Sequence, residues 1–99
     1  MNSKRLKRLR ARAFERQQGR CYYCEIPMWL TNKSEFATRY GWTMKQAELR
    51  RCTAEHLVAR CDGGKDSAAN VVAACWSCNS TRHRRKLVPP PERWHQIRN

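Results

Sequence analysis

Long apolar runs are missing from this sequence of 99 residues, and its hydrophobic fraction is 40%. Runs such as Val71-Val72-Ala73-Ala74 are far shorter than the roughly 20 apolar residues of a membrane-spanning helix. The basic N-terminal segment also lacks the apolar stretch of a secretory signal. We therefore expect a protein that has no membrane role and is located in the cytoplasm.

Acidic residues are scarce as well, with eight Asp and Glu against 21 Lys and Arg, and the net charge is +13. The excess lies at the two ends: residues 1–20 carry eight basic and one acidic residue, and residues 80–99 carry six and one. Residues 21–79 are nearly neutral, with seven basic and six acidic residues. Such basic ends attract polyanions through counterion release, which predicts a nucleic-acid partner. The alternative is a solvated basic surface that keeps a small protein soluble.

The short length limits the core. A chain of 99 residues forms a single domain with a modest core, and such domains often need a metal or disulfides for stability. Six cysteines are present, and four of them form two Cys-x-x-Cys pairs. Without a secretory signal a reducing compartment is expected, where paired cysteines favour metal binding. We divide domain 1–99 into a basic N-terminal helix (1–20), a zinc-clamped core (21–88) and a basic tail (89–99).

Hydrophobic spacing and capping residues predict the N-terminal half of the fold. Residues 4–18 are expected to form a helix whose apolar face carries Leu6, Leu9 and Ala13. Two capping-box patterns, at 32–35 and 43–46, predict short helices within an insertion at 33–51. Such a pair resembles a helix-turn-helix, but an insertion that packs on the core is the preferred interpretation.

The C-terminal half is expected to run from strand to loop to strand to helix. Residues 52–59 suit a strand followed by a turn into a Gly-Gly loop, and residues 70–74 suit a second short strand. Residues 78–87 suit a basic helix that ends before three prolines. No internal repeat is present. The order predicts a small α+β domain.

The paired cysteines predict a structural zinc site formed by Cys21, Cys24, Cys75 and Cys78. Two residues between paired cysteines let both sulfurs face one ion, and two such turns complete a tetrahedral site with no open position. A redox role is disfavoured, because two matched pairs in so small a chain are hard to explain that way. Cys52 and Cys61 are not part of these pairs, and we expect them to be small buried hydrophobes.

A second set of polar residues lies between and just beyond the cysteine pairs: Glu55, His56, Asn70, Asn79 and His83. Asn79 and His83 are four residues apart on the predicted helix, so they share a face. Glu55 and His56 are adjacent on a strand and point to opposite sides, so one can bind a metal while the other faces a substrate. Carboxylate, amide and imidazole donors suit a divalent ion with open water positions. With a neutral histidine as base, this set predicts phosphodiester hydrolysis.

Over residues 20–86 the sequence resembles the HNH (ββα-metal) endonuclease family. The residues that carry the resemblance are Cys21 and Cys24, Glu55-His56, Gly63-Gly64, Asn70, Cys75 and Cys78, Asn79, and Arg82. The resemblance implies two antiparallel strands and a helix around one catalytic metal.

The resemblance also implies a role for each matching residue. His56 would be the general base and Glu55 a metal ligand, while Asn70 would brace the loop that orients His56. Asn79 stands where the family often has His, as in an H-N-N variant, and its amide oxygen favours Mg²⁺ or Mn²⁺ as the catalytic ion. His83 matches a second helical histidine that colicin-type nucleases use on the metal; whether it binds the ion or lines the groove stays open.

These features together predict an endonuclease that nicks or cuts DNA with little sequence specificity. The basic side chains expected to contact phosphates are Arg60, Arg82, Arg84, Arg85 and Lys86. Arg82 is also a candidate for stabilising the transition state. The resemblance implies 5′-phosphate and 3′-hydroxyl products. The settings in which members of this family occur also suggest that a phage or a bacterial mobile element encodes the protein.

Two alternatives remain open. A non-catalytic zinc module that binds DNA or RNA would use the same charge and the same cysteines, but it leaves the second polar set unexplained. A structural accessory, such as a phage packaging protein that binds a terminase, is the other. The site specificity and the oligomeric state do not follow from the sequence.

Overall fold

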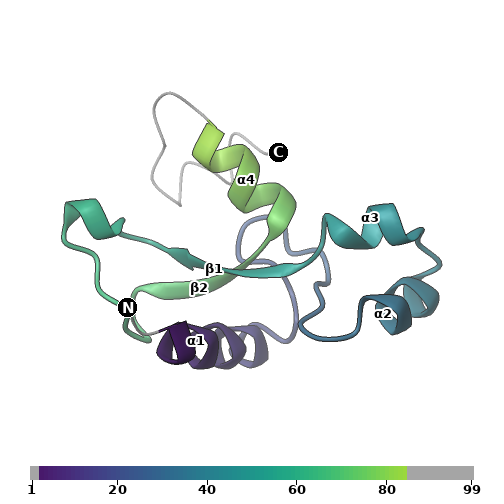
Figure 1. Ribbon diagram of the computed structural model, residues 1–99, viewed down its shortest axis with the longest axis horizontal. Coiled ribbons are helices and arrows are strands. Elements are labelled where there is room, and N and C mark those ends of the chain that lie inside the picture. Colours follow the sequence, from purple (N-terminus) through teal and green to yellow (C-terminus); the bar gives the residue numbers. More distant parts are fainter. Residues whose placement is uncertain (1–2, 85–99) are drawn as a thin grey trace.

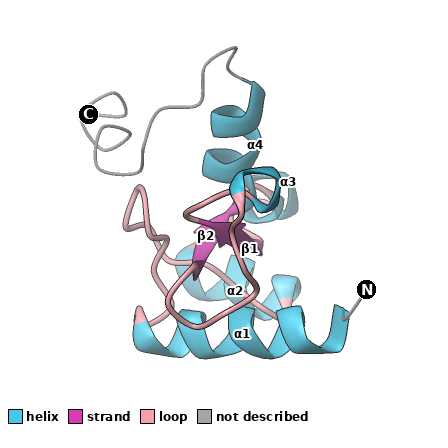
Figure 2. Cartoon of the chain, turned by 90° about the vertical axis from the view of Figure 1, so that its left-hand side faces the viewer, coloured by secondary structure: helices cyan, strands magenta, loops and turns pink. Residues whose placement is uncertain are grey.

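The computed structural model describes residues 3–84. Its elements in chain order are α1 (Ser3–Arg16), α2 (Lys33–Tyr40), α3 (Met44–Glu48), β1 (Cys52–His56), the 3-10 turn η1 (Arg60–Asp62), β2 (Val71–Cys75) and α4 (Trp76–Arg84). The two strands pair antiparallel, with Cys52 opposite Cys75 and His56 opposite Val71. Helix α1 covers one face of this hairpin and α4 lies on the other (Figure 1, Figure 2). The predicted α+β fold, with two strands leading into a helix, is confirmed.

Helix α1 packs on β2 through the apolar face that its sequence predicts. Leu9 and Ala13 are buried there. Just after the helix, the Gln17 side chain pairs with the backbone of β2: its Nε2 donates to Ala73 O at 2.8 Å, and Ala73 N donates to its Oε1 at 2.9 Å. Gly19 follows with a φ of 74°, a left-handed conformation that suits a glycine after a helix. A side-chain amide thus takes the place that a third strand would occupy.

Strand β2 is buried along its whole length because helices cover both of its faces. Its alanines and Cys75 join Ala13, Tyr23 and Met28 in the main hydrophobic core. Most of these side chains are small, so the core is thin, as the length and composition indicate. Additional stabilisation by a metal is consistent with this core.

The predicted insertion forms helices α2 and α3. The Asn32 side chain accepts from Glu35 N, Gly41 ends α2 with a φ of 68°, and Thr43 and Gln46 form a complete capping box. The two helices enclose a separate hydrophobic cluster of Phe36, Ala37 and Ala47, against which Trp29 and Trp42 pack. The insertion therefore builds a small core of its own to one side of the hairpin (Figure 1), instead of packing on the main core as expected.

Two boundaries have local causes. Within the strand and turn predicted for residues 52–59, strand β1 ends at His56 because the side chain of Asn70 replaces the strand partner: it accepts from Val58 N and donates to Val58 O. Helix α4 begins at Trp76, two residues before the predicted start. The sulfur of Cys75 accepts a hydrogen bond from Cys78 N at 3.4 Å and so caps the first turn.

The two cysteines outside the paired set differ in exposure. Cys52 is buried as expected, but Cys61 is exposed, so the expectation that both are buried hydrophobes is wrong for Cys61. Among the described residues, no helix is both long enough and apolar enough to cross a bilayer.

Candidate functional site

The four paired cysteines converge on one point. Cys21 and Cys24 follow α1, whereas Cys75 and Cys78 lie where β2 passes into α4. Their Sγ atoms all lie within 4.8 Å of one another. Zinc bound to four thiolates at about 2.3 Å would hold the sulfurs about 3.8 Å apart. The distance of 3.9 Å between the sulfurs of Cys24 and Cys75 fits that geometry, so the four cysteines are positioned to hold a metal ion, consistent with structural zinc.

Hydrogen-bond donors surround these sulfurs, as is usual around metal-bound thiolates. The backbone N–H groups of Tyr23 and Cys75 donate to Cys21 Sγ at 3.4 and 3.3 Å. The guanidinium of Arg50, which follows α3, approaches Cys75 Sγ at 3.7 Å and Cys24 Sγ at 3.9 Å. Four thiolates around one divalent ion leave a net negative charge, which the cation of Arg50 offsets.

The thiols also interact with one another. The hydrogen bond from Cys21 is the largest cause that lowers the pKa of Cys75, to about 6. The pKa of Cys24 is lowered as well, again chiefly by Cys21. By contrast, burial raises the pKa of Cys52 to about 12, so Cys52 stays a neutral thiol outside the cluster.

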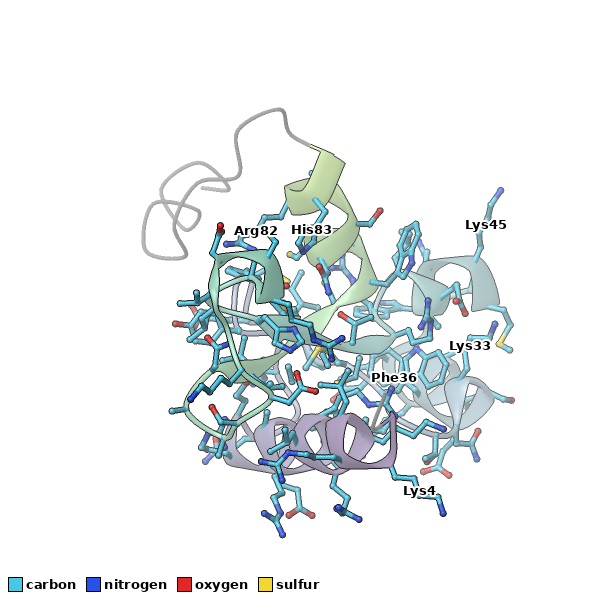
Figure 3. The ribbon with its side chains drawn as sticks, turned by 60° about the vertical axis from the view of Figure 1, so that its left-hand side comes forward. Lys4, Lys33, Phe36, Lys45, Arg82 and His83 are labelled. Atoms are coloured by element: carbon cyan, nitrogen blue, oxygen red, sulfur yellow. The ribbon has the colours of Figure 1, made fainter. Side chains whose placement is uncertain are left out.

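A second polar cluster lies between β1 and α4, on the other side of the hairpin from α1. Glu55 is 3% exposed, and the strand alternation turns it toward α4. Its Oε2 accepts from Arg82 Nη1 at 2.5 Å and from the Tyr23 hydroxyl at 3.4 Å, while Oε1 lies 3.1 Å from His83 Nε2. Figure 3 shows Arg82 and His83 on this side of the molecule. The buried carboxylate thus has a cation on one oxygen and an imidazole at the other.

Asn79 lies one helical turn before His83. Its Nδ2 donates to Thr53 Oγ1 at 3.0 Å, and that hydroxyl donates in turn to Ala74 O at 2.6 Å. Because the Thr53 hydroxyl proton is already donated to Ala74 O, the Thr53 oxygen can only accept a hydrogen bond from Asn79. The nitrogen of the Asn79 amide therefore faces β1. The amide oxygen, which is the atom that binds cations, is left on the other side of the amide.

The separation of one donor pair, Glu55 and His83, is compatible with two adjacent ligands of a small divalent ion. Two adjacent ligands of an octahedral ion at about 2.1 Å are about 3 Å apart. The 3.1 Å between Glu55 Oε1 and His83 Nε2 matches this separation. The His83 side chain is 54% exposed, whereas that of Glu55 is 4% exposed, so the pair opens to solvent on the histidine side.

His56 is not part of this cluster. It ends β1, and its Nε2 lies 2.7 Å from Asp66 Oδ1 in the loop between the strands. Arg60 reaches both oxygens of Asp66 at 3.0 Å. The hydrogen bond with His56 is the largest cause that holds the pKa of Asp66 below its usual range. The structure thus groups His56 with Asp66 and Arg60, and Glu55 with His83 and Arg82, at the same end of one strand.

Asn70 and the Gly63-Gly64 pair shape the loop around Asp66. Besides its two bonds to Val58, the Asn70 side chain donates to Lys65 O at 3.0 Å. Gly63 has a φ of 89°. A Cβ on Gly64 would lie 1.7 Å from Val58 O, so only glycine fits there. The loop is therefore held by an amide and by a backbone contact that excludes any side chain.

The residues expected to contact phosphates differ in their surroundings. Arg82 is buried against Glu55, which does not suit the expected surface contact with DNA; its cation holds a carboxylate instead. Arg60 is partly exposed and is paired with Asp66. Helix α4 extends to Arg84, and Arg85 and Lys86 lie outside the described residues, as does the basic tail.

Three residues of these clusters were not singled out from the sequence: Tyr23, Arg50 and Asp66. For Asp66 a signal existed, because an acid in a glycine-rich loop close to a candidate base is a natural partner for that base. The contacts of Tyr23 and Arg50 span 32 and 26 residues, and no local pattern indicates them.

Comparison with protein families matches residues 41–85 to the HNH endonuclease family. The matched segment contains both strands, the loop and α4, together with Cys75 and Cys78. No curated protein and no solved structure matches the chain. The ββα fold and the cysteine cluster agree with this match, and the resemblance drawn from the sequence is confirmed over residues 41–85. The family associates this domain with nuclease activity and hence with a nucleic-acid substrate.

Proposed function

We propose that this protein is a metal-dependent endonuclease that hydrolyses DNA phosphodiester bonds. The observation that carries the proposal is the 3.1 Å contact between Glu55 and His83, which brings two donors from β1 and α4 to one point. In a binding-only zinc module the ion pair with Arg82 would account for the buried carboxylate of Glu55, but not for the exposed imidazole of His83 at its other oxygen, beside the strand end that carries His56. We therefore favour catalysis over the binding-only alternative.

Glu55, Asn79 and His83 would hold the catalytic ion, Mg²⁺ or Mn²⁺. When bound, such an ion supplies Lewis-acid stabilisation of the charge that develops on the phosphate. Arg82 and Tyr23 donate to Oε2 of Glu55, so the carboxylate stays oriented with Oε1 toward His83. Burial raises the pKa of Tyr23 above its usual range, so its hydroxyl remains a donor.

His56 would act as the general base. Its Nε2 is engaged with Asp66, which leaves Nδ1 to take a proton from the attacking water. Asp66 would fix the tautomer of the ring and stabilise the imidazolium that forms, as a buried carboxylate does for a catalytic histidine. Asn70 would support this arrangement by bracing the loop on both sides of Asp66.

Duplex DNA is the proposed substrate, cut with little sequence specificity. The net charge of +13 supports binding through the phosphate backbone, and phosphate contacts carry no sequence information. We place the protein in the cytoplasm of a bacterial host, encoded by a phage or a mobile element, and products would have 5′-phosphate and 3′-hydroxyl ends. A packaging partner such as a terminase is a secondary proposal.

The test is a plasmid-nicking assay on the zinc-loaded protein with a panel of divalent ions. We expect conversion of supercoiled to nicked or linear DNA with Mg²⁺ or Mn²⁺ and none when the zinc-loaded protein receives no further divalent ion. If the protein binds DNA but never cuts it with any ion, the binding module is the better description. Cutting that appears only after a packaging protein is added would support the accessory role.

A further inference from the structure

The cations of α1 form an exposed surface on the side of the hairpin opposite α4. Arg5, near the start of the helix, also reaches the loop that holds Asp66, where its Nε donates to Asp66 O at 3.1 Å. The helix contains seven basic residues and one acidic residue, and none of its first-turn residues is acidic. Its exposed basic side chains are those of Lys4, Arg5, Lys7, Arg8, Arg12 and Arg16. Because Leu9 and Ala13 face β2, this basic surface points outward.

The exposed row of Lys4, Arg8 and Arg12 lacks acidic partners. Residues four apart lie on one side of a helix, about 6 Å apart along its axis. Within residues 3–84, none of the three forms an ion pair. The insertion differs, because there Lys33 and Arg51 both pair with Glu48 at 3.1 Å. Like charges along α1 repel one another, so a polyanion that neutralises them would be bound favourably.

The position of this row separates it from the phosphate that would be cut. Glu55 and His83 lie between β1 and α4, whereas Lys4 projects from the opposite side of the molecule (Figure 3). A sheet and a helix of about 10 Å diameter lie between the outer surface of α1 and the site. A straight duplex seated on that outer surface therefore does not reach Glu55 and His83.

We propose that the outer face of α1 binds a second segment of duplex DNA, separate from the one presented to the candidate active site. This inference rests on the proposed function for its choice of DNA as the polyanion. One chain would then hold two duplex segments on opposite faces of its hairpin.

The first arm of the test is the salt dependence of binding, measured on the zinc-loaded protein with a 20-base-pair duplex in Ca²⁺ and without a chelator, so that cleavage is not needed. The test variant is Arg8→Gln/Arg12→Gln, and Arg39→Gln/Lys45→Gln removes the same charge from the insertion. If both α1 cations contact phosphates, the slope of log affinity against log salt falls in magnitude by about two. The control should change it far less, and Arg8→Lys/Arg12→Lys should behave like the wild type. Equal slopes in the two Gln variants would overturn the proposal.

The second arm measures energy transfer between two duplexes that carry donor and acceptor dyes. The wild type should bring the two duplexes together, and Arg8→Gln/Arg12→Gln should abolish the signal while the insertion control keeps it. A smaller salt slope without energy transfer in the wild type would mean that α1 contacts the same duplex, which contradicts two separate segments. If the salt slope and the energy transfer change as expected but no ion supports nicking, the α1 surface still binds a second duplex and only the proposed nuclease function is wrong.

Discussion

Nε2 of His83 lies 3.1 Å from Oε1 of Glu55, and this contact joins the helix of the ββα unit to its first strand. The other oxygen of Glu55 accepts a hydrogen bond from Arg82, which lies on the same helix one residue before His83. A single buried carboxylate therefore has two tasks: it anchors α4 through a buried ion pair, and it presents one oxygen beside an exposed imidazole.

Loss of the Arg82 cation should destabilise the fold. Arg82→Ala leaves the carboxylate of Glu55 buried without its ion-pair partner, which typically costs about 3–5 kcal/mol. Urea unfolding of the zinc-loaded protein should show this decrease in the free energy of unfolding. Arg60→Ala is the matched control, since the Arg60–Asp66 pair is more exposed and should cost about 1 kcal/mol or less. Equal losses in the two variants would show that the buried pair has no special role.

Removal of either member of the Glu55–His83 pair should weaken binding of the catalytic ion. We expect Glu55→Gln and His83→Ala to lower Mn²⁺ affinity about tenfold or more, because even changes outside the ligand shell cost that much. Titration of the zinc-loaded protein, followed by the electron paramagnetic resonance of free Mn²⁺, measures the affinity. Glu48→Gln, an acid of the insertion, should leave it unchanged. Unaltered Mn²⁺ binding in His83→Ala would make that histidine a groove residue and not a ligand.

Asp66→Asn should impair the proposed base without disturbing the metal sites. The amide cannot stabilise an imidazolium as a carboxylate does, so the nicking rate should fall about tenfold to a hundredfold. Imidazole ¹⁵N shifts should show a changed tautomer population for His56, which a purely structural loss would not produce. Asp62→Asn, an exposed acid of the same loop, is the control. A nicking rate at or above that of the wild type would mean that Asp66 competes with the substrate for His56.

The cysteine cluster should bind one zinc ion per chain, and its removal should unfold the domain. Structural zinc contributes folding free energy directly, so a strong chelator should abolish the cooperative transition. Zinc binds the thiolate forms, so protons compete with the metal for the four sulfurs and zinc should be released as the pH falls. Zinc content that is unchanged at pH 5 would contradict this.

The contact of Arg50 with two sulfurs gives a separate prediction. Arg50→Gln removes the cation that offsets the charge of the thiolates, so zinc affinity should fall about tenfold. Competition with a chromophoric chelator measures this without any nuclease assay. Arg51→Gln, whose side chain pairs with Glu48 and not with sulfur, is the matched control. If both variants lose zinc equally, the effect of Arg50 is general destabilisation.

The sequence allowed the fold class and the cysteine site to be predicted because their signals are local. Paired cysteines, capping residues such as Asn32 and Thr43, and the alternation at Glu55 each depend on neighbours within a few positions. The structure confirms the α+β fold and brings the four cysteines together. The roles of Glu55, His56, Asn70, Asn79 and His83 stay predictions that the experiments above test.

The surroundings of the candidate site were less predictable because they arise from contacts between distant segments. Nothing near Arg82 in the sequence indicates that it is buried against a carboxylate 27 residues away, and a basic helix suggested a phosphate contact instead. The separate core of the insertion likewise depends on Trp29 and Trp42, which pack from outside the two helices. The end of strand β1 at His56 also depends on a distant residue, because the Asn70 side chain takes the place of a strand partner, and strand periodicity does not indicate where that happens.

The most direct test of the central claim is the nicking rate of His56→Ala relative to the wild type, both zinc-loaded and saturated with Mn²⁺. If His56 takes the proton from water beside an ion held by Glu55, Asn79 and His83, the rate should fall about a hundredfold or more. Zinc content and DNA affinity should stay as in the wild type. A His56→Ala protein that nicks plasmid as fast as the wild type would contradict the account.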